Sequence, residues 1–244
     1  MDTTSLTTQN PVAAENPFSP ASAEPAPTGR RRRGAELGPF RPRWGERLGG
    51  IGLLVAPLLF AGGFATAPVQ TEEGTAGYIA SLAADPALSL WSANLLHYGW
   101  VALVFGAFAS IGLLRGRPGR IWLPLAAAIL AFGAIQMSGL LLSDWFQIGI
   151  GSTVSAADAV AIDTAAKDWT VGVWQISGMA AGILGIGLLS LGLAKAKAIS
   201  WWIAPLGFLP WVVPAVIPGP VGVAASVVCF APLAVAGIRL VRAR

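Results

Sequence analysis

Six segments of about 20 mostly apolar residues fill the chain from residue 48 onward, and they constrain its fold more than any other feature. A helix needs roughly 20 apolar residues to cross the hydrocarbon core of a bilayer, which is about 30 Å thick. Only 11% of the residues are charged, less than half of the proportion in soluble domains, which is about 25%. The sequence therefore predicts an all-α, polytopic integral membrane protein. Its six transmembrane helices are expected at residues 48–67, 90–114, 121–143, 170–194, 200–217 and 220–240.

The charged residues are divided between the two sides of this arrangement. Fifteen of the 16 Lys and Arg residues fall on one side, and Lys167 is the exception. The acidic residues from Glu72 to Asp168 fall on the other side. Positive loops stay in the cytoplasm, so both termini are expected there. Tryptophans at the expected boundaries agree with this orientation. The composition, rich in Ala, Gly and Arg, is typical of a high-GC bacterium, so we expect the bacterial cytoplasmic membrane.

The first 46 residues differ from the rest of the chain. Residues 1–46 are rich in Pro, Ala, Ser and Thr and have little apolar surface to bury. Such a segment is expected to be a disordered cytoplasmic tail, and residues 47–244 form the membrane domain. Arg30–Arg33, in the basic stretch that ends the tail, is a candidate site for anionic lipid. The simpler alternative is that these arginines only set the topology.

Two loops on the outer side are expected to contain short surface helices, at residues 75–85 and 155–168. In the first, Asp85-Pro86 has the pattern of an N-cap followed by a first-turn proline. In the second, Ser155 and Asp158 have the spacing of a capping box. Five prolines between residues 205 and 220 predict kinks in the last hairpin.

Polar side chains inside the spans are costly and mark candidate sites. His97, Gln136 and Gln175 are expected at a similar depth, roughly 9–12 Å below the outer surface at 1.5 Å per residue. Asn94 and Ser143 lie on the same faces, and two acidic residues stand near the mouth. If the second, third and fourth spans are neighbours, these residues would line one outward-facing pocket. The alternative is interhelical hydrogen bonding without a ligand. The complete candidate ligand set is His97, Asn94, Gln136, Ser143, Asp144, Asp168 and Gln175.

Small residues in the fourth span predict close helix packing. Gly178 and Gly182 form a GxxxG pattern, and Gly185 continues the same face. Packing within the fold is favoured over a dimer interface. Aligning Trp91 with Trp169 also places His97 opposite Gln175, which suggests a duplicated hairpin made of spans one–two and three–four. Chance similarity is the alternative, because Ala and Gly are abundant.

No motif in the sequence names a reaction. One histidine and one cysteine do not suggest a metal site, and no cofactor is expected. Hydrolase and nucleotide-binding signatures are absent from the sequence. The basic residues flank hydrophobic segments, so nucleic acid is not an expected partner. The first hypothesis is a membrane scaffold or accessory subunit that binds the bilayer and other membrane proteins. A small transporter or channel using the His97, Gln136 and Gln175 pocket is the alternative, and a membrane enzyme ranks last.

Overall fold

The computed structural model describes residues 44–114, 121–167 and 169–242, all within one compact unit, Gly38–Arg244. Arg30–Arg33 and Asp168 lie outside the described residues. The first part contains α1 (Trp44–Thr66), α2 (Gly74–Ala84), α3 (Pro86–Ser110), η1 (Ile111–Leu114), α4 (Trp122–Thr153), α5 (Ala156–Ala166) and α6 (Trp169–Lys195). The second contains η2 (Ala204–Phe208), α7 (Val212–Val216), α8 (Pro220–Cys229) and α9 (Ala231–Arg242).

Four of these helices are long and apolar enough to cross a bilayer. They are α1, α3 with η1, α4 and α6, with 23, 29, 32 and 27 residues. The pair α8 and α9, bent by 50°, is a fifth candidate. At 1.5 Å per residue, the 23 residues of α1 extend about 35 Å, longer than the hydrocarbon core. The protein is therefore an all-α, multi-pass membrane protein with four or five candidate spans in the part of the chain described.

The segment 200–217, predicted as the fifth span, does not form a continuous helix. It contains η2 and α7, which have five residues each. Proline has no N–H to donate and its ring blocks the preceding turn, so Pro205, Pro210 and Pro214 interrupt the hydrogen-bond ladder. The hydroxyl of Ser226 in α8 donates instead to the carbonyl of Pro210, at 2.6 Å. The prolines thus break the predicted span rather than only bending it.

The predicted short helices between the long ones are present as α2 and α5. The carboxylate of Asp85 accepts a hydrogen bond from the Leu88 amide at 3.0 Å, as its N-cap pattern predicted. Ser155 accepts from the Asp158 amide at 3.2 Å and donates to the Asp158 carboxylate at 2.6 Å. Helix α4 departs further from its predicted bounds, because it continues ten residues beyond the predicted end at 143. The chain between α4 and α5 is correspondingly short.

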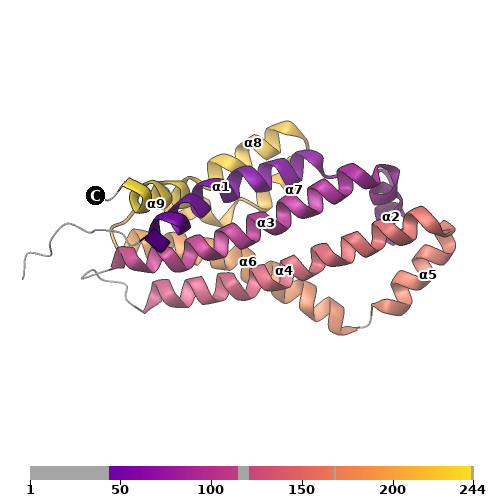
Figure 1. The fold of residues 1–244 in the computed structure, drawn as a ribbon, viewed down its shortest axis with the longest axis horizontal. Helices are drawn as coiled ribbons and strands as arrows, with labels where there is room; N and C mark the ends of the chain where they lie inside the picture. The colour runs from indigo at the N-terminus through magenta and orange to yellow at the C-terminus, as the bar shows by residue number, and fades with distance from the viewer. Residues whose placement is uncertain (1–43, 115–120, 168, 243–244) are drawn as a thin grey trace, which may run out of the picture. The chain divides into compact units, whose positions relative to one another are not determined.

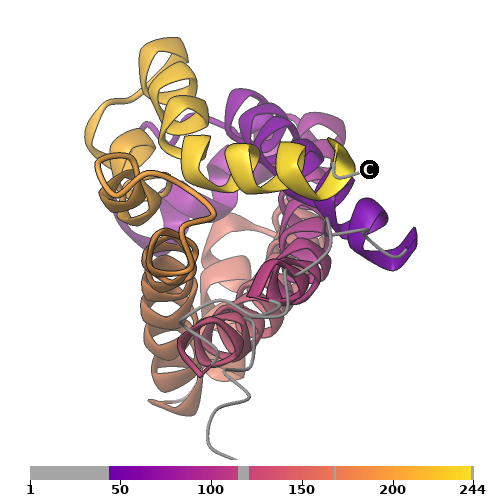
Figure 2. The same cartoon turned by 90° about the vertical axis from the view of Figure 1, so that its left-hand side faces the viewer.

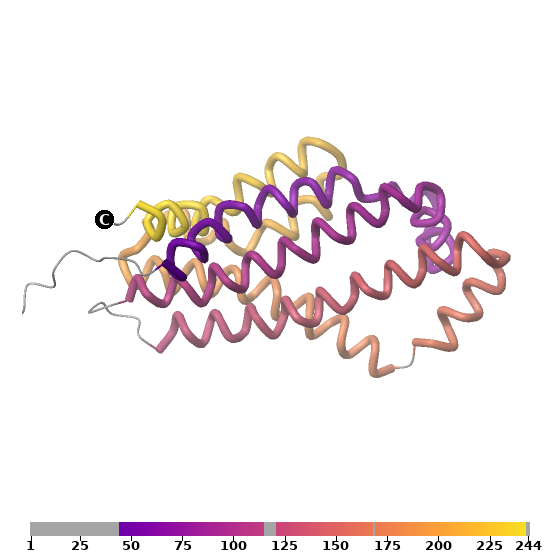
Figure 3. Tube along the Cα trace, viewed as in Figure 1, coloured from indigo at the N-terminus to yellow at the C-terminus, as the bar shows by residue number. Residues whose placement is uncertain are grey.

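The long helices form two hairpins, α1 with α3 and α4 with α6, joined through α3 and α4. Each hairpin contains one short helix between its long ones, the same order that a duplication would produce. Figures 1 and 3 show α2 and α5 at one end of this unit, opposite the start of α1 and the end of α9. We call these the α2–α5 end and, after the last residue of α6, the Lys195 end.

An aromatic cluster connects the first hairpin to the C-terminal segment. Phe60 stacks on Phe230 with ring centroids 5.4 Å apart, and Trp100 stacks on Trp211 at 5.0 Å. Phe60 also meets Trp100 edge to face at 5.2 Å. Nearer the Lys195 end, α9 crosses α1, and Figure 2 shows it lying across the other helices. The C-terminal segment is therefore part of the core.

Candidate functional site

The α2–α5 end contains a cavity of about 450 Å³, which we call the α2–α5 cavity. It lies among α2, α3, α4, α5 and α6, with Trp211 also in its lining. Its polar side chains are Tyr78, Ser143, Asp144, Gln147, Asp163, Lys167 and Gln175. Its aromatic side chains are Tyr78, Trp100, Phe146, Trp174 and Trp211. The volume falls in the range of small-molecule sites, about 300–1,000 Å³.

Asp144 enters the cavity because α4 continues as a helix past residue 143. The phenol of Tyr78, from α2, donates a hydrogen bond to Asp144 Oδ1 at 2.7 Å. Burial, the negative charge of Asp144 and this hydrogen bond together raise the pKa of Tyr78 above its ordinary value. Tyr78 is therefore a neutral donor at physiological pH.

Helix α2 is held against α4 at Gly151, where a Cβ would overlap Ile79 and Ala83.

A second carboxylate, Asp163 of α5, is fully occupied by protein partners. Its side chain is 5% exposed. Asp163 accepts a hydrogen bond from Gln147 Nε2 at 2.7 Å, and Lys167 Nζ lies 2.7 Å and 2.9 Å from its two oxygens. The Gln147 hydrogen bond fastens α5 to α4, and Lys167 neutralises one negative charge. Among the residues described, Asp144 forms no such ion pair, so the formal charges of Asp144, Asp163 and Lys167 sum to −1.

The structure brings together only some of the residues that the sequence grouped. Ser143, Asp144 and Gln175 line the α2–α5 cavity. His97 and Gln136 do not line it. Asp168, the remaining acidic candidate, lies outside the described residues.

His97 and Gln136 instead bridge neighbouring helices. His97 Nδ1 lies 2.7 Å from Ser138 Oγ, which joins α3 to α4. Gln136 Nε2 donates to Ser177 Oγ at 2.9 Å, which joins α4 to α6. Asn94 donates to the Leu90 carbonyl one turn earlier in its own helix, at 2.7 Å. The first two geometries are those of the interhelical hydrogen bonds that the sequence left as the alternative.

Four polar cavity residues were not identified from the sequence: Tyr78, Gln147, Asp163 and Lys167. Gln147 was missed because the third span was ended at residue 143. The apolar Phe146 and Ile148, with no proline before residue 154, were a signal that the helix continues. Tyr78 and Asp163 were assigned to surface helices, whose inward faces could not be recognised without knowing the packing.

Two of the tryptophans that line the cavity have indole N–H groups without a hydrogen-bond partner among the residues described. Trp100 Nε1 and Trp211 Nε1 are buried and have no hydrogen-bond partner within the described part of the chain. Both tryptophans line the cavity. Within residues 44–114, 121–167 and 169–242, no group of three His, Cys, Asp or Glu side chains is placed to hold a metal ion. The arrangement is suited to binding a small ligand by one carboxylate, aromatic faces and a few donors.

Gly178, Gly182 and Gly185 of α6 lie against α4 rather than on an outer face. A Cβ on Gly178 would overlap Gln136, and one on Gly185 would overlap the backbone of Leu130. Gly182 lies against Gly133 and the ring of Trp100. These contacts set the distance between the two helices.

Comparison with protein-family models, with curated proteins and with solved structures finds no match for this chain.

Proposed function

We propose that this protein is a membrane transporter that receives a small organic cation in the α2–α5 cavity. The observation that supports it most directly is the Asp144 carboxylate. It lies in a cavity of ligand size, is oriented by Tyr78, and has no ion-pair partner among the described side chains. An ionisable group within a membrane segment is expensive and is by default a functional-site hypothesis.

The ligand class follows from the other groups in the wall. A cation would offset the remaining negative charge of the cavity. Aromatic faces attract cations through their negative quadrupole, most strongly where water is excluded. Trp174 and Phe146, in the lining of the same cavity as Asp144, provide such rings. An anionic ligand would oppose Asp144, and a purely apolar one would leave the carboxylate desolvated without a partner.

The orientation of the cavity is part of the proposal. We infer six membrane crossings, with both termini cytoplasmic and the α2–α5 end outside, from the distribution of basic residues. In support, the segment from η2 to α9 runs along α1. Gly237 meets Gly50 near the start of α1, and Trp211 meets Phe64 near its end. The 14 helical residues from Gly50 to Phe64 correspond to about 21 Å, most of the hydrocarbon core. Broken backbone at that depth is tolerated where protein surrounds it.

A scaffold was the first hypothesis from the sequence, and it stays a prediction. Its expected contact segment, the tail of residues 1–46, is almost entirely outside the described residues, as is the anionic-lipid site at Arg30–Arg33. The Gly178, Gly182 and Gly185 face lies against α4, so it does not favour a partner. For a hydrolase, the His97–Ser138 pair would need a third group to orient the imidazole. Within the described residues, no carboxylate is hydrogen-bonded to His97.

Binding can be tested on the purified protein in detergent, with choline as the probe cation and its neutral isostere 3,3-dimethylbutan-1-ol as the comparison. Choline is expected to raise the thermal midpoint of the wild-type protein, and the neutral isostere is not. Asp144→Asn should abolish the shift while preserving the fold, because the amide oxygen can still accept from Tyr78. Asp158→Asn, an exposed position of α5 outside the cavity, is the matched control.

Two results would overturn the proposal. The first is an equal choline shift in the wild-type protein and Asp144→Asn, or the absence of any shift. The second is binding without uptake of labelled choline into proteoliposomes, which would replace transport with a receptor role.

A further inference from the structure

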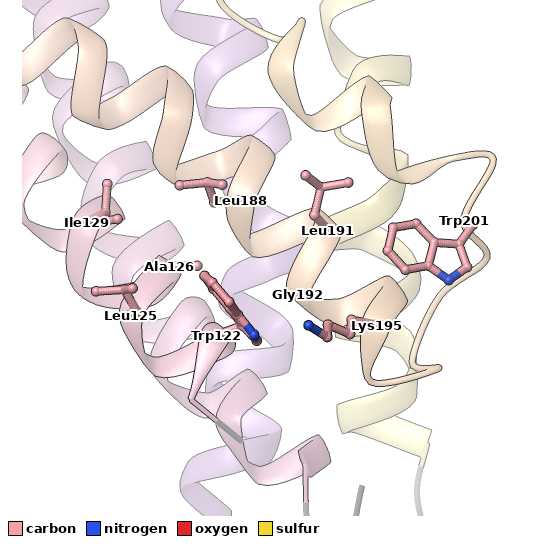
Figure 4. A pocket seen from close by; sticks show the side chains of 9 residues that line it. All are labelled: Trp122, Leu125, Ala126, Ile129, Leu188, Leu191, Gly192, Lys195 and Trp201. Carbon is pink, nitrogen blue, oxygen red and sulfur yellow. The ribbon is translucent and has the colours of Figure 1, made fainter. Parts of the chain in front are cut away.

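A second pocket lies at the opposite end of the α4–α6 pair, with a volume of about 320 Å³ (Figure 4). Leu125 and Ile129 of α4 form one wall, and Leu188 and Leu191 of α6 form the other. We call it the Lys195 groove. Leu125 is 49% exposed and Leu188 is 37% exposed. In a bilayer, the groove therefore opens toward the lipid rather than into the protein.

One cation stands at the mouth of this apolar groove. Lys195 Nζ lies 5.0 Å from the ring centroid of Trp122. Figure 4 shows the Lys195 ammonium pointing toward the Trp122 indole. The Trp122 and Trp201 indoles are both more than half exposed. Tryptophan at a membrane–water boundary sits at the level of the headgroups.

The charges around the groove favour a negatively charged ligand. Within the described residues, no carboxylate forms an ion pair with Lys195 and no acidic side chain lines the groove. Lys197, two residues later, adds a second cation at this end of α6, and Arg239 donates to the Lys197 carbonyl at 3.2 Å. A basic segment of this chain would be repelled by this surface.

We propose that the Lys195 groove binds one anionic phospholipid. An acyl chain lies between α4 and α6, and the headgroup phosphate pairs with Lys195. Basic pockets between transmembrane helices recognise anionic headgroups in this way. Trp122 and Trp201 lie beside the glycerol region of the bound lipid. A neutral phospholipid fits the walls equally well but gains less from the ammonium, so the groove discriminates by headgroup.

The test is native mass spectrometry of the full-length protein in detergent, with dioleoylphosphatidylglycerol and dioleoylphosphatidylcholine as probes. The wild-type protein is expected to retain the anionic lipid about fivefold more strongly than the neutral one, the effect of one basic residue near the surface. Lys195→Gln should remove this preference, and Lys195→Arg should retain it. Lys197→Gln, which lies outside the groove, is the matched control and should reduce the preference less than Lys195→Gln does.

A second pair of variants tests the groove itself. Leu188→Trp fills the space between the helices and should reduce retention of both lipids. Leu184→Trp places the same side chain on an exposed position of α6 outside the groove, and should have no effect. sn-Glycerol 3-phosphate tests whether a free phosphate is sufficient. The proposal requires it to bind at least tenfold more weakly than the lipid.

Four outcomes would overturn the proposal: equal retention of the two lipids, equal loss in Lys195→Gln and Lys197→Gln, undiminished retention in Leu188→Trp, or tight binding of the free phosphate. Removal of lipid that produces a dimer would instead assign the groove to a second copy of the chain.

Discussion

The two halves of the α4–α6 pair differ in how closely the helices approach. Toward the Lys195 end the backbones touch, because a Cβ on Gly133 would overlap Ala181 and Gly182, and one on Gly185 would overlap Leu130. Toward the α2–α5 end, two glycines of the pair lie in open surroundings. A Cβ on Gly149 of α4 or on Gly172 of α6 would meet no neighbouring heavy atom within 4 Å.

The change occurs where α6 contacts α4 through the side chain of Trp174 rather than through a glycine. Its ring lies against Gly139, and the α2–α5 cavity begins beside it. One helix pair thus combines a close backbone contact at Gly133 and Gly185 with a ligand-sized space toward the α2–α5 end. The comparison shows that the number of glycines does not determine packing, whereas the face on which each glycine lies does.

The largest expected effect is at the close contact. Gly133→Val should destabilise the protein by about 3 kcal/mol or more, because the overlapping atoms are backbone and cannot move aside. Gly149→Val, on the same helix in open space, should change the free energy of unfolding by less than about 1 kcal/mol. Unfolding in SDS followed by tryptophan fluorescence measures both. Equal destabilisation would show that the two halves do not differ.

A smaller loss of stability is expected at Asp163, which holds α5 against α4. Asp163→Ala removes the acceptor for Gln147 and Lys167, which should cost about 1–3 kcal/mol. Asp158→Ala, on the exposed N-terminal turn of α5, should cost less. Hydrogen exchange should show faster exchange of the α5 amides in the Asp163 variant. Unchanged α5 exchange would indicate that other contacts hold this helix.

The long helices could be predicted from the sequence, whereas the course of the C-terminal segment could not. Helix α1 (Trp44–Thr66) and α6 (Trp169–Lys195) begin and end within a few residues of their predicted spans. Apolar runs of this length have few alternatives in a membrane protein. Hydropathy alone does not register the missing N–H of proline, so 200–217 was predicted as a span although it forms only short helices.

The candidate site was less predictable, because depth along a helix does not determine the direction of a side chain. His97, Gln136 and Gln175 were grouped by depth. His97 faces Ser138 and Gln136 faces Ser177, whereas Gln175 lines the cavity. Each residue along a helix turns the side chain by about 100°. The rotation of each helix is set by its packing against neighbours, which the sequence alone did not specify.

The state of Tyr78 offers a spectroscopic test of the cavity. The chain has two tyrosines, so Tyr98→Phe leaves Tyr78 as the only phenol to titrate. Burial, the charge of Asp144 and the hydrogen bond all raise the pKa of Tyr78, so ionisation should begin above the ordinary value of about 10. Asp144→Asn removes a negative charge and should lower that pKa. Ultraviolet difference titration in detergent measures the shift. An ordinary Tyr78 titration would mean that the phenol faces water and the cavity is not closed by α2.

The smallest effect is expected at a polar residue outside the cavity. Ser138→Ala removes the hydrogen bond to His97. Interhelical hydrogen bonds in membranes contribute about 0.6 kcal/mol on average, so the unfolding free energy should fall by that order. Choline binding should not change, because neither partner lines the α2–α5 cavity. Unfolding in SDS and the choline-dependent thermal shift measure the two quantities on one preparation. A loss of choline binding as large as that of Asp144→Asn, at unchanged stability, would place the His97–Ser138 pair within the binding site and remove the distinction between packing contacts and cavity residues.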